Sequence, residues 1–388
     1  MKESLYRLLI DLLSQPTAPF REQRVIALAS TVLDEAGIPF FLDPVGNLVV
    51  GASSKTDTLR LLRETSKEPV RVFIAHMDHP GFHGVRWIKP NVLRVRWHGG
   101  SPSKHLQGSS VWLANDDGFE SIGVMRNARL KKHGWSIDTA EVHVPHAPPS
   151  PRPPAKTLFG GFDFRKPVWK SGARLHTRAA DDLVGVFCIL ATALAVFGKR
   201  KGKARPPFLG LLTRAEEVGF VGALGHFELG WLRQARRPLV CVSLEASRTL
   251  PGALVGKGPI VRLGDRRTPF DAAYLQVLTQ LAEEVLPGQH QRRIMDGGSC
   301  EGSAATAYGF PAIAMAVPLG NYHNQGLEGG PDCRGHLGPA PEFVHLGDIE
   351  GQYKLCGALM RKGLPWHDPW QEVRKKLRKN SSDYRSLL

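Results

Sequence analysis

One pattern recurs along this chain: a short apolar run leads to a polar side chain that is able to bind a metal ion. The runs occupy residues 71–75, 207–213, 238–244 and 311–317. Apolar runs of this length are typical of strands buried on both faces, as in the parallel sheets of α/β proteins. The carboxyl ends of parallel strands meet at one edge of a sheet. The pattern therefore predicts an α/β fold with a mostly parallel central sheet and a cluster of polar side chains at one edge.

The polar residues at this predicted edge form a ligand set for two metal ions. Imidazole and carboxylate ligands that converge on one sheet edge suit a dinuclear zinc or cobalt hydrolase. A structural zinc finger is disfavoured, because no two cysteines are close enough for a Cys-x-x-Cys pair. The predicted metal ligands are His76, Asp181, Glu217, Glu245 and His323.

The pair Asp181-Asp182 stands just before an apolar stretch, residues 186–197, that is long enough for a buried helix. An aspartate at a helix start caps the helix and interacts favourably with the helix dipole. A carboxylate placed there is also able to bridge two cations with its two oxygens. The residues alone leave both interpretations open.

Two further acidic residues adjoin the predicted ligands and are candidate catalytic residues. Glu216 precedes Glu217 and is placed to act as a base, although a solvated acidic turn is the alternative interpretation. Asp78 follows His76 by two residues, so its carboxylate is in position to accept the second ring N–H of the imidazole and fix its tautomer. For this His-x-Asp sequence, a plain strand-end turn is the alternative.

Taken in order, these motifs resemble a known family. The chain is similar to the dinuclear-metal aminopeptidases of the tetrahedral, glutamyl and deblocking aminopeptidase family. The fold implied is an α/β/α sandwich exopeptidase domain with a small inserted β domain. The motifs that carry the resemblance are Ala75-His76-Met77-Asp78, Asp181-Asp182-Leu183-Val184-Gly185, Glu216-Glu217-Val218-Gly219, Glu245 and His323.

The resemblance also implies a division of labour among the ligands. Asp181 would bridge two divalent ions, most simply zinc or cobalt. His76 and Glu245 would complete one metal site, and Glu217 and His323 the other. Similar enzymes hold the peptide bond after the bridging aspartate in cis.

The reaction implied is hydrolysis of a peptide bond at a chain end. Metal-bound hydroxide would attack the carbonyl with Glu216 as general base, because coordination lowers the pKa of water to about 7. The leading hypothesis is an aminopeptidase that acts on short peptides. Glu245 stands where the family usually has Asp, which keeps a carboxypeptidase or an N-acyl amino-acid deacylase as the alternative. A noncatalytic binding or scaffold protein is the third hypothesis.

The chain is long enough for two domains, with 388 residues. Segments that alternate apolar and polar residues, as half-buried strands do, lie within residues 85–173. We therefore expect an inserted β domain at 85–173 and a discontinuous catalytic domain at 1–84 and 174–388. In similar enzymes the insert covers the site and mediates assembly, so we expect a homo-oligomer, either a dimer or a dodecamer.

The net charge of +15 raises the question of other partners. Basic runs at 199–205 and 374–379 could attract nucleic acid or anionic membranes nonspecifically. We expect solvated segments instead, with a peptide as substrate and no specific nucleic-acid or membrane partner. No stretch approaches the roughly 18 uncharged apolar residues of a membrane span. The five separate cysteines favour a reducing compartment, and we expect the cytoplasm.

Overall fold

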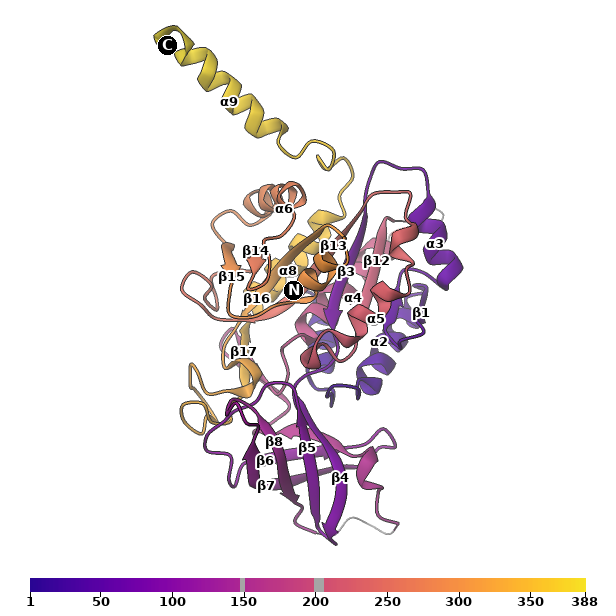
Figure 1. Ribbon diagram of the computed structural model, residues 1–388, viewed down its shortest axis with the longest axis vertical. Coiled ribbons are helices and arrows are strands. Elements are labelled where there is room, and N and C mark those ends of the chain that lie inside the picture. Colours follow the sequence, from indigo (N-terminus) through magenta and orange to yellow (C-terminus); the bar gives the residue numbers. More distant parts are fainter. Residues whose placement is uncertain (147–150, 199–205) are drawn as a thin grey trace.

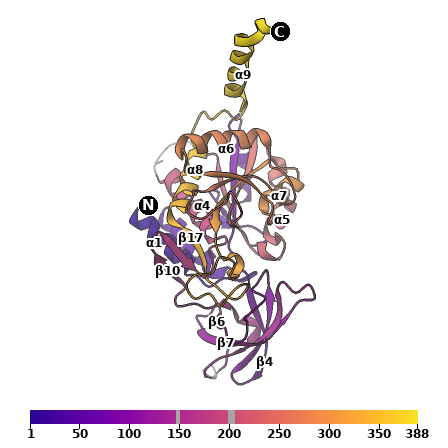
Figure 2. The ribbon, with the colours of Figure 1, turned by 90° about the vertical axis from the view of Figure 1, so that its left-hand side faces the viewer.

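The computed structural model describes residues 1–146, 151–198 and 206–388 (Figure 1). The basic run at 199–205 lies outside the described residues. The chain forms a larger α/β part and a smaller barrel of antiparallel strands. Figures 1 and 2 place the barrel at one end of the molecule and helix α9 (Gln371–Tyr384) at the other.

An eight-stranded sheet forms the centre of the larger part, in the order β1-β2-β12-β3-β13-β16-β14-β15. The pairs β12/β3, β3/β13, β13/β16 and β14/β15 are parallel, whereas β1/β2, β2/β12 and β14/β16 are antiparallel. The predicted α/β fold with a mostly parallel sheet is confirmed. The strands are β1 (Phe40–Leu42), β2 (Leu48–Val50), β3 (Val70–His76), β12 (Phe208–Thr213), β13 (Leu239–Arg248), β14 (Ile260–Asp265), β15 (Gln291–Met295) and β16 (Ala312–Leu319).

Helices cover both faces of this sheet and explain why its central strands are largely apolar. In β3, Phe73 and Ala75 pack into one core, with helices α1, α2, α4, α6 and α8. Val72 and Ile74 pack into a second core on the other face, with α3, α5 and α7. The helices are α1 (Glu3–Leu13), α2 (Gln23–Glu35), α3 (Lys55–Arg63), α4 (Leu183–Phe197), α5 (Val221–Glu228), α6 (Ala272–Val285), α7 (Glu301–Ala307) and α8 (Leu346–Leu359).

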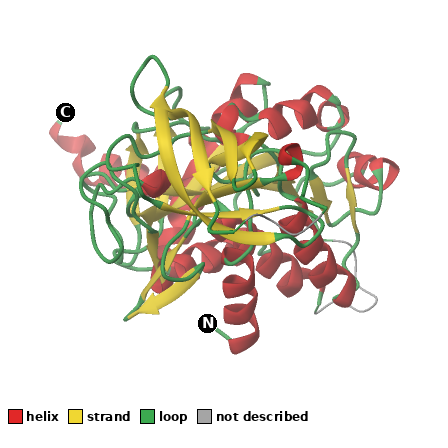
Figure 3. Ribbon diagram, turned by 90° about the horizontal axis from the view of Figure 1, so that it is seen from below, coloured by secondary structure: helices red, strands yellow, loops and turns green. Residues whose placement is uncertain are grey.

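The smaller part is a closed barrel in the order β4-β5-β8-β7-β6-β9, with a hydrophobic core of its own. Its strands stand in front of the helices of the larger part when the molecule is seen from below (Figure 3). They begin at Gly81 and end at Phe162, within a slightly different range from the expected insert at 85–173, whose boundaries remain a prediction. The strands are β4 (Gly81–Lys89), β5 (Val92–His98), β6 (Ser110–Ala114), β7 (Glu120–Leu130), β8 (Ile137–His143) and β9 (Phe159–Phe162).

A third, three-stranded sheet consists of β10 (Val168–Ser171), β11 (Arg174–Thr177) and β17 (Glu342–His345). Among the described residues, no helix is both long and apolar enough to span a membrane. Short 3-10 helices complete the fold: η1 (Ala155–Thr157), η2 (Glu216–Val218), η3 (Leu232–Gln234), η4 (Tyr322–Asn324) and η5 (Arg385–Leu387).

Candidate metal centre

His76 is the last residue of β3, and its ring is almost completely buried. Its Nδ1 lies 3.0 Å from the backbone carbonyl of Asp78, so Nδ1 donates and Nε2 is left to act as a ligand. We expected the Asp78 carboxylate to accept this N–H, but that carboxylate lies 3.6 Å away. The tautomer is therefore fixed mainly by the main chain of Asp78.

The Asp78 carboxylate instead holds the turn that carries the two adjacent glutamates. Its Oδ1 accepts a hydrogen bond from the backbone N–H of Glu216 (2.9 Å), and its Oδ2 accepts one from that of Glu217 (3.2 Å). Just before them, Ala215 has a left-handed backbone, with φ of 52°, and its N–H donates to the buried Glu22. Two carboxylates thus fix the main chain from which Glu216 and Glu217 project.

The two adjacent aspartates differ in position, since one caps a helix and the other faces the cluster. Asp182 is the N-cap of α4, and its Oδ1 accepts the N–H of Gly185 (3.1 Å). Asp181 faces the cluster, with Oδ1 3.3 Å from His76 Nε2 and Oδ2 3.7 Å from His323 Nε2. The Asp181–Asp182 peptide bond is cis. Because each oxygen of Asp181 faces a different imidazole, its geometry suits a bridging ligand.

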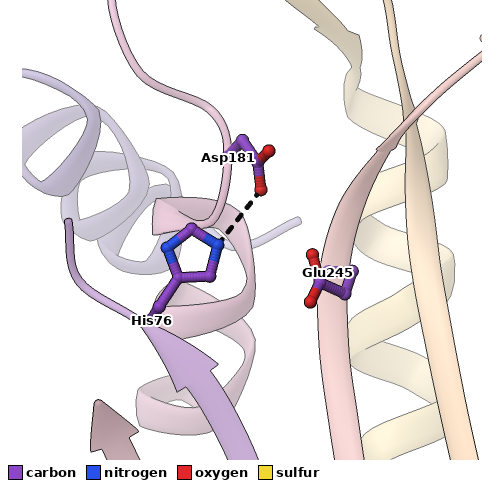
Figure 4. A group of neighbouring side chains, drawn as sticks. All are labelled: His76, Asp181 and Glu245. Atoms are coloured by element: carbon purple, nitrogen blue, oxygen red, sulfur yellow. Dashed lines mark ion pairs between the residues drawn. The ribbon is translucent and has the colours of Figure 1, made fainter. Parts of the chain in front are cut away.

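Glu245 lies within a strand rather than at its end. We expected β13 to stop before this residue, but β13 continues to Arg248 because its pairing with β16 extends to Leu319. Glu245 therefore has an extended backbone on both sides. Figure 4 shows its carboxylate directed toward His76 and Asp181, which come from separate segments.

The last ligand, His323, is in η4 and has a left-handed backbone with φ of 55°. Its Nε2 lies 3.0 Å from Glu217 Oε2. The ligand atoms of His76, Asp181 and Glu245 lie within 4.8 Å of one another, as do those of Asp181, Glu217 and His323. The structure thus brings all the residues of the predicted ligand set together in two groups that share Asp181. A third such group consists of His76, Glu216 and Glu217.

The cluster concentrates negative charge in a buried place. Burial, together with the neighbouring Asp181, raises the pKa of Glu245 to about 8. Burial and the nearby carboxylates of Glu245 and Glu217 raise the pKa of Glu216 well above its usual value. Burial lowers the pKa of His323, but the carboxylates of Glu217 and Asp181 outweigh it, so that this pKa is raised.

Several oxygens of the cluster also have no hydrogen-bond donor within the described part of the chain. They are Asp181 Oδ1, Glu217 Oε1 and Glu245 Oε1, all of which are buried. Buried polar atoms are rarely left unpaired, and buried charges are normally paired or bind metals. The imidazole and carboxylate donors therefore fit two divalent cations, one in each group.

Three buried residues near the cluster were not anticipated from the sequence. His79 Nδ1 donates to the carbonyl of Asp181 (2.8 Å), and Glu301 Oε1 accepts from the hydroxyl of Thr213 (2.6 Å). Glu342 accepts from the main chain of both Asp181 and His323. No spacing in the sequence signals these contacts, because their partners are distant along the chain.

The fold and the cluster define a class: α/β proteins with adjoining groups of histidine and carboxylate side chains that could hold metal ions at one edge of a mostly parallel sheet. Residues 161–327 match the family model described as M42 glutamyl aminopeptidase. The chain is also similar to solved structures of aminopeptidases. Together these findings confirm the resemblance to the tetrahedral, M42-type aminopeptidase family.

Three of the similar solved structures are aminopeptidases or peptidases. TET1 peptidase of Pyrococcus horikoshii matches with a TM-score of 0.68 and 21% identity over 92% of this chain and 99% of its own. Aminopeptidase APDkam598 of Desulfurococcus kamchatkensis matches with a TM-score of 0.70 and 21% identity, over 94% of this chain and 96% of its own. A TET aminopeptidase of Thaumarchaeota archaeon SCGC AB-539-E09 matches with a TM-score of 0.71 and 17% identity, over 93% of this chain and 98% of its own. At these identities the matches establish the fold. No curated protein matches the chain in sequence.

Proposed function

We propose that this protein is a metal-dependent aminopeptidase that removes residues from the amino terminus of short peptides. The observation that carries the proposal is the position of Asp181, which directs one oxygen toward His76 and the other toward His323. This arrangement suits a carboxylate shared by two cations, of which zinc and cobalt fit the donors best. When bound, such cations would polarise the scissile carbonyl and lower the pKa of water.

The roles of Glu216 and Glu217 differ by position. Glu217 Oε2 lies 3.0 Å from His323 Nε2, as expected of two ligands of one ion, whereas Glu216 Oε2 lies 3.9 Å from His76 Nε2. We assign Glu216 as the general base that takes a proton from water and returns it to the leaving amine. Asp78 positions both glutamates through their backbone N–H groups.

A pocket beside Glu245 offers a place for the terminal residue of the substrate. Its wall includes Arg262, Ser299 and Met295. Arg262 is buried, its Nη1 donates to Ser247 at 3.2 Å, and its Nε has no partner within the described residues. A guanidinium in the wall of a pocket favours a carboxylate ligand. The pocket therefore suits an amino-terminal Glu or Asp.

The same guanidinium is the specific observation that favours the second candidate, a carboxypeptidase or N-acyl amino-acid deacylase. In those enzymes the carboxylate would belong to the end of the substrate rather than to its side chain. The free cysteines are consistent with the cytoplasm, which we keep as the proposed location.

The test is a substrate panel on the purified protein before and after exhaustive chelation. We expect turnover of free-amino Glu and Asp anilides, little turnover of N-acetylated versions, and loss of activity with the metal. Preferential cleavage of N-acyl amino acids would establish the second candidate. Activity that survives complete removal of metal would reject both.

A further inference from the structure

Glu342 is a completely buried carboxylate at the start of β17, outside the residues that match the family model. Its Oε2 accepts hydrogen bonds from the N–H groups of Ala180 (2.7 Å) and Asp181 (3.2 Å). Its Oε1 accepts one from the N–H of His323 (2.9 Å). One side chain thus contacts the main chain of two residues of the candidate metal centre.

The position of β17 explains how the carboxylate of Glu342 reaches both Asp181 and His323. Glu342 pairs with Thr177 of β11, the strand that leads to Asp181. Its neighbour Phe343 forms an isolated bridge with Gly320, just before the turn that contains His323. β17 therefore lies between the two ligand-bearing segments and joins them.

The segment around His323 needs such support. Asn321, His323 and Asn324 have φ values of 54°, 55° and 57°. Left-handed conformations are sparsely populated by residues other than glycine and persist only where the surroundings hold them. The bond from His323 N–H to Glu342 Oε1 is one such restraint, and a buried carboxylate is a strong acceptor.

We propose that Glu342 is a positioning residue that fixes Asp181 relative to His323. It thereby sets the affinity of the cation site made by Asp181, Glu217 and His323. The site made by His76, Asp181 and Glu245 depends on it less, because within the described residues Glu342 forms no hydrogen bond or ion pair with His76 or Glu245. His79, whose Nε2 lies 4.0 Å from Glu342 Oε1, also holds the carbonyl of Asp181. This inference rests on the metal centre of the proposed function, but not on the reaction.

The test is a titration of the full-length, metal-free protein with Co²⁺. Binding is monitored by calorimetry and by the visible absorbance of the bound Co²⁺. In the wild type, the two carboxylate oxygens of Glu342 accept hydrogen bonds from the N–H groups of Ala180, Asp181 and His323. In Glu342→Gln, the side-chain amide has only one oxygen that is able to accept them. We expect the second equivalent of Co²⁺ to bind roughly 10–100-fold more weakly, as is usual when a residue supporting a ligand is lost. The first equivalent should bind as in the wild type.

The matched control is Asp348→Asn. Asp348 is a buried carboxylate that also accepts from main-chain N–H groups, those of Gly256 (2.6 Å) and Gly258 (2.8 Å), away from the ligands. Both equivalents of Co²⁺ should bind normally to this variant. Equal weakening in the two variants would reduce Glu342 to a general structural role and overturn the proposal.

Two more variants keep the test decisive. His323→Ala provides the reference for a damaged second site, and Glu342→Gln should reproduce its titration in milder form. If Glu342→Gln does not fold, Glu342→Asp retains the charge with a shorter reach and should still weaken the second equivalent selectively. Normal binding of both equivalents by a folded Glu342 variant would overturn the proposal. Two-site binding without peptidase activity would instead reject the proposed function alone.

Discussion

Glu216 and Glu217 are neighbours, yet replacing each by glutamine should impair the protein in a different way, through turnover in one variant and through metal content in the other. Glu216→Gln removes the base, so turnover should fall roughly 10²–10⁴-fold while the metal content is kept. Glu217→Gln removes an anionic ligand that faces His323, so the metal content should fall and excess metal should partly restore activity. Elemental analysis and steady-state kinetics on both variants make the comparison. Equal loss of metal in the two variants would contradict the assignment.

At the scale of single residues, the sequence predicted those ligands whose position follows from a strand or a helix. His76 ends a strand and Asp181 precedes a helix, so periodicity placed both. The ring N–H of His76 meets the carbonyl of Asp78 rather than the expected carboxylate, because a sequence shows that two residues are close but not which atoms meet. Glu22 and Glu342 were missed because their partners are main-chain N–H groups contributed by distant segments.

At the scale of elements, the central strands and α4 were predictable because each coincides with a largely apolar run of the sequence. The end of β13 was not, because its length depends on pairing with β16 rather than on its own residues. The order of the strands in the closed barrel was equally unpredictable, since the alternation of apolar and polar residues identifies a strand but not the strands beside it.

Helix α9 supplies a prediction at this scale. None of its residues is buried, whereas Trp366, just before it, is buried against Tyr274 and Arg71. Removal of residues 371–388 should therefore leave the free energy of unfolding and the metal content unchanged. Trp366→Ala should lower that free energy by about 3–5 kcal/mol, as expected for a large buried side chain. Urea unfolding of both variants is the measurement, and equal destabilisation would show that α9 packs on the body.

At the scale of the whole molecule, the barrel is the expected surface of assembly. It exposes the apolar side chains of Val85, Ile88, Ile122, Leu130 and Trp135, the last with 74% of its surface exposed. Exposed apolar groups gathered on one part of a protein mark interaction surfaces. We therefore expect this chain to form at least a dimer.

Light scattering tests the assembly. The wild type should have at least twice the chain mass of 42.6 kDa, and the double variant Ile122→Arg, Trp135→Ser should shift toward that mass. Leu254→Arg, an exposed leucine of the larger part, is the control and should not change the mass. A wild type that stays at the chain mass over a wide range of concentrations would refute the expectation.

The ligands of the candidate metal centre are distributed from His76 to His323, and Glu342 follows later still. During synthesis on a ribosome, a nascent chain therefore cannot complete the centre until most of its length has emerged and the segment around β17 has folded back. In this architecture the order of synthesis places the assembly of the candidate metal centre near the end of folding.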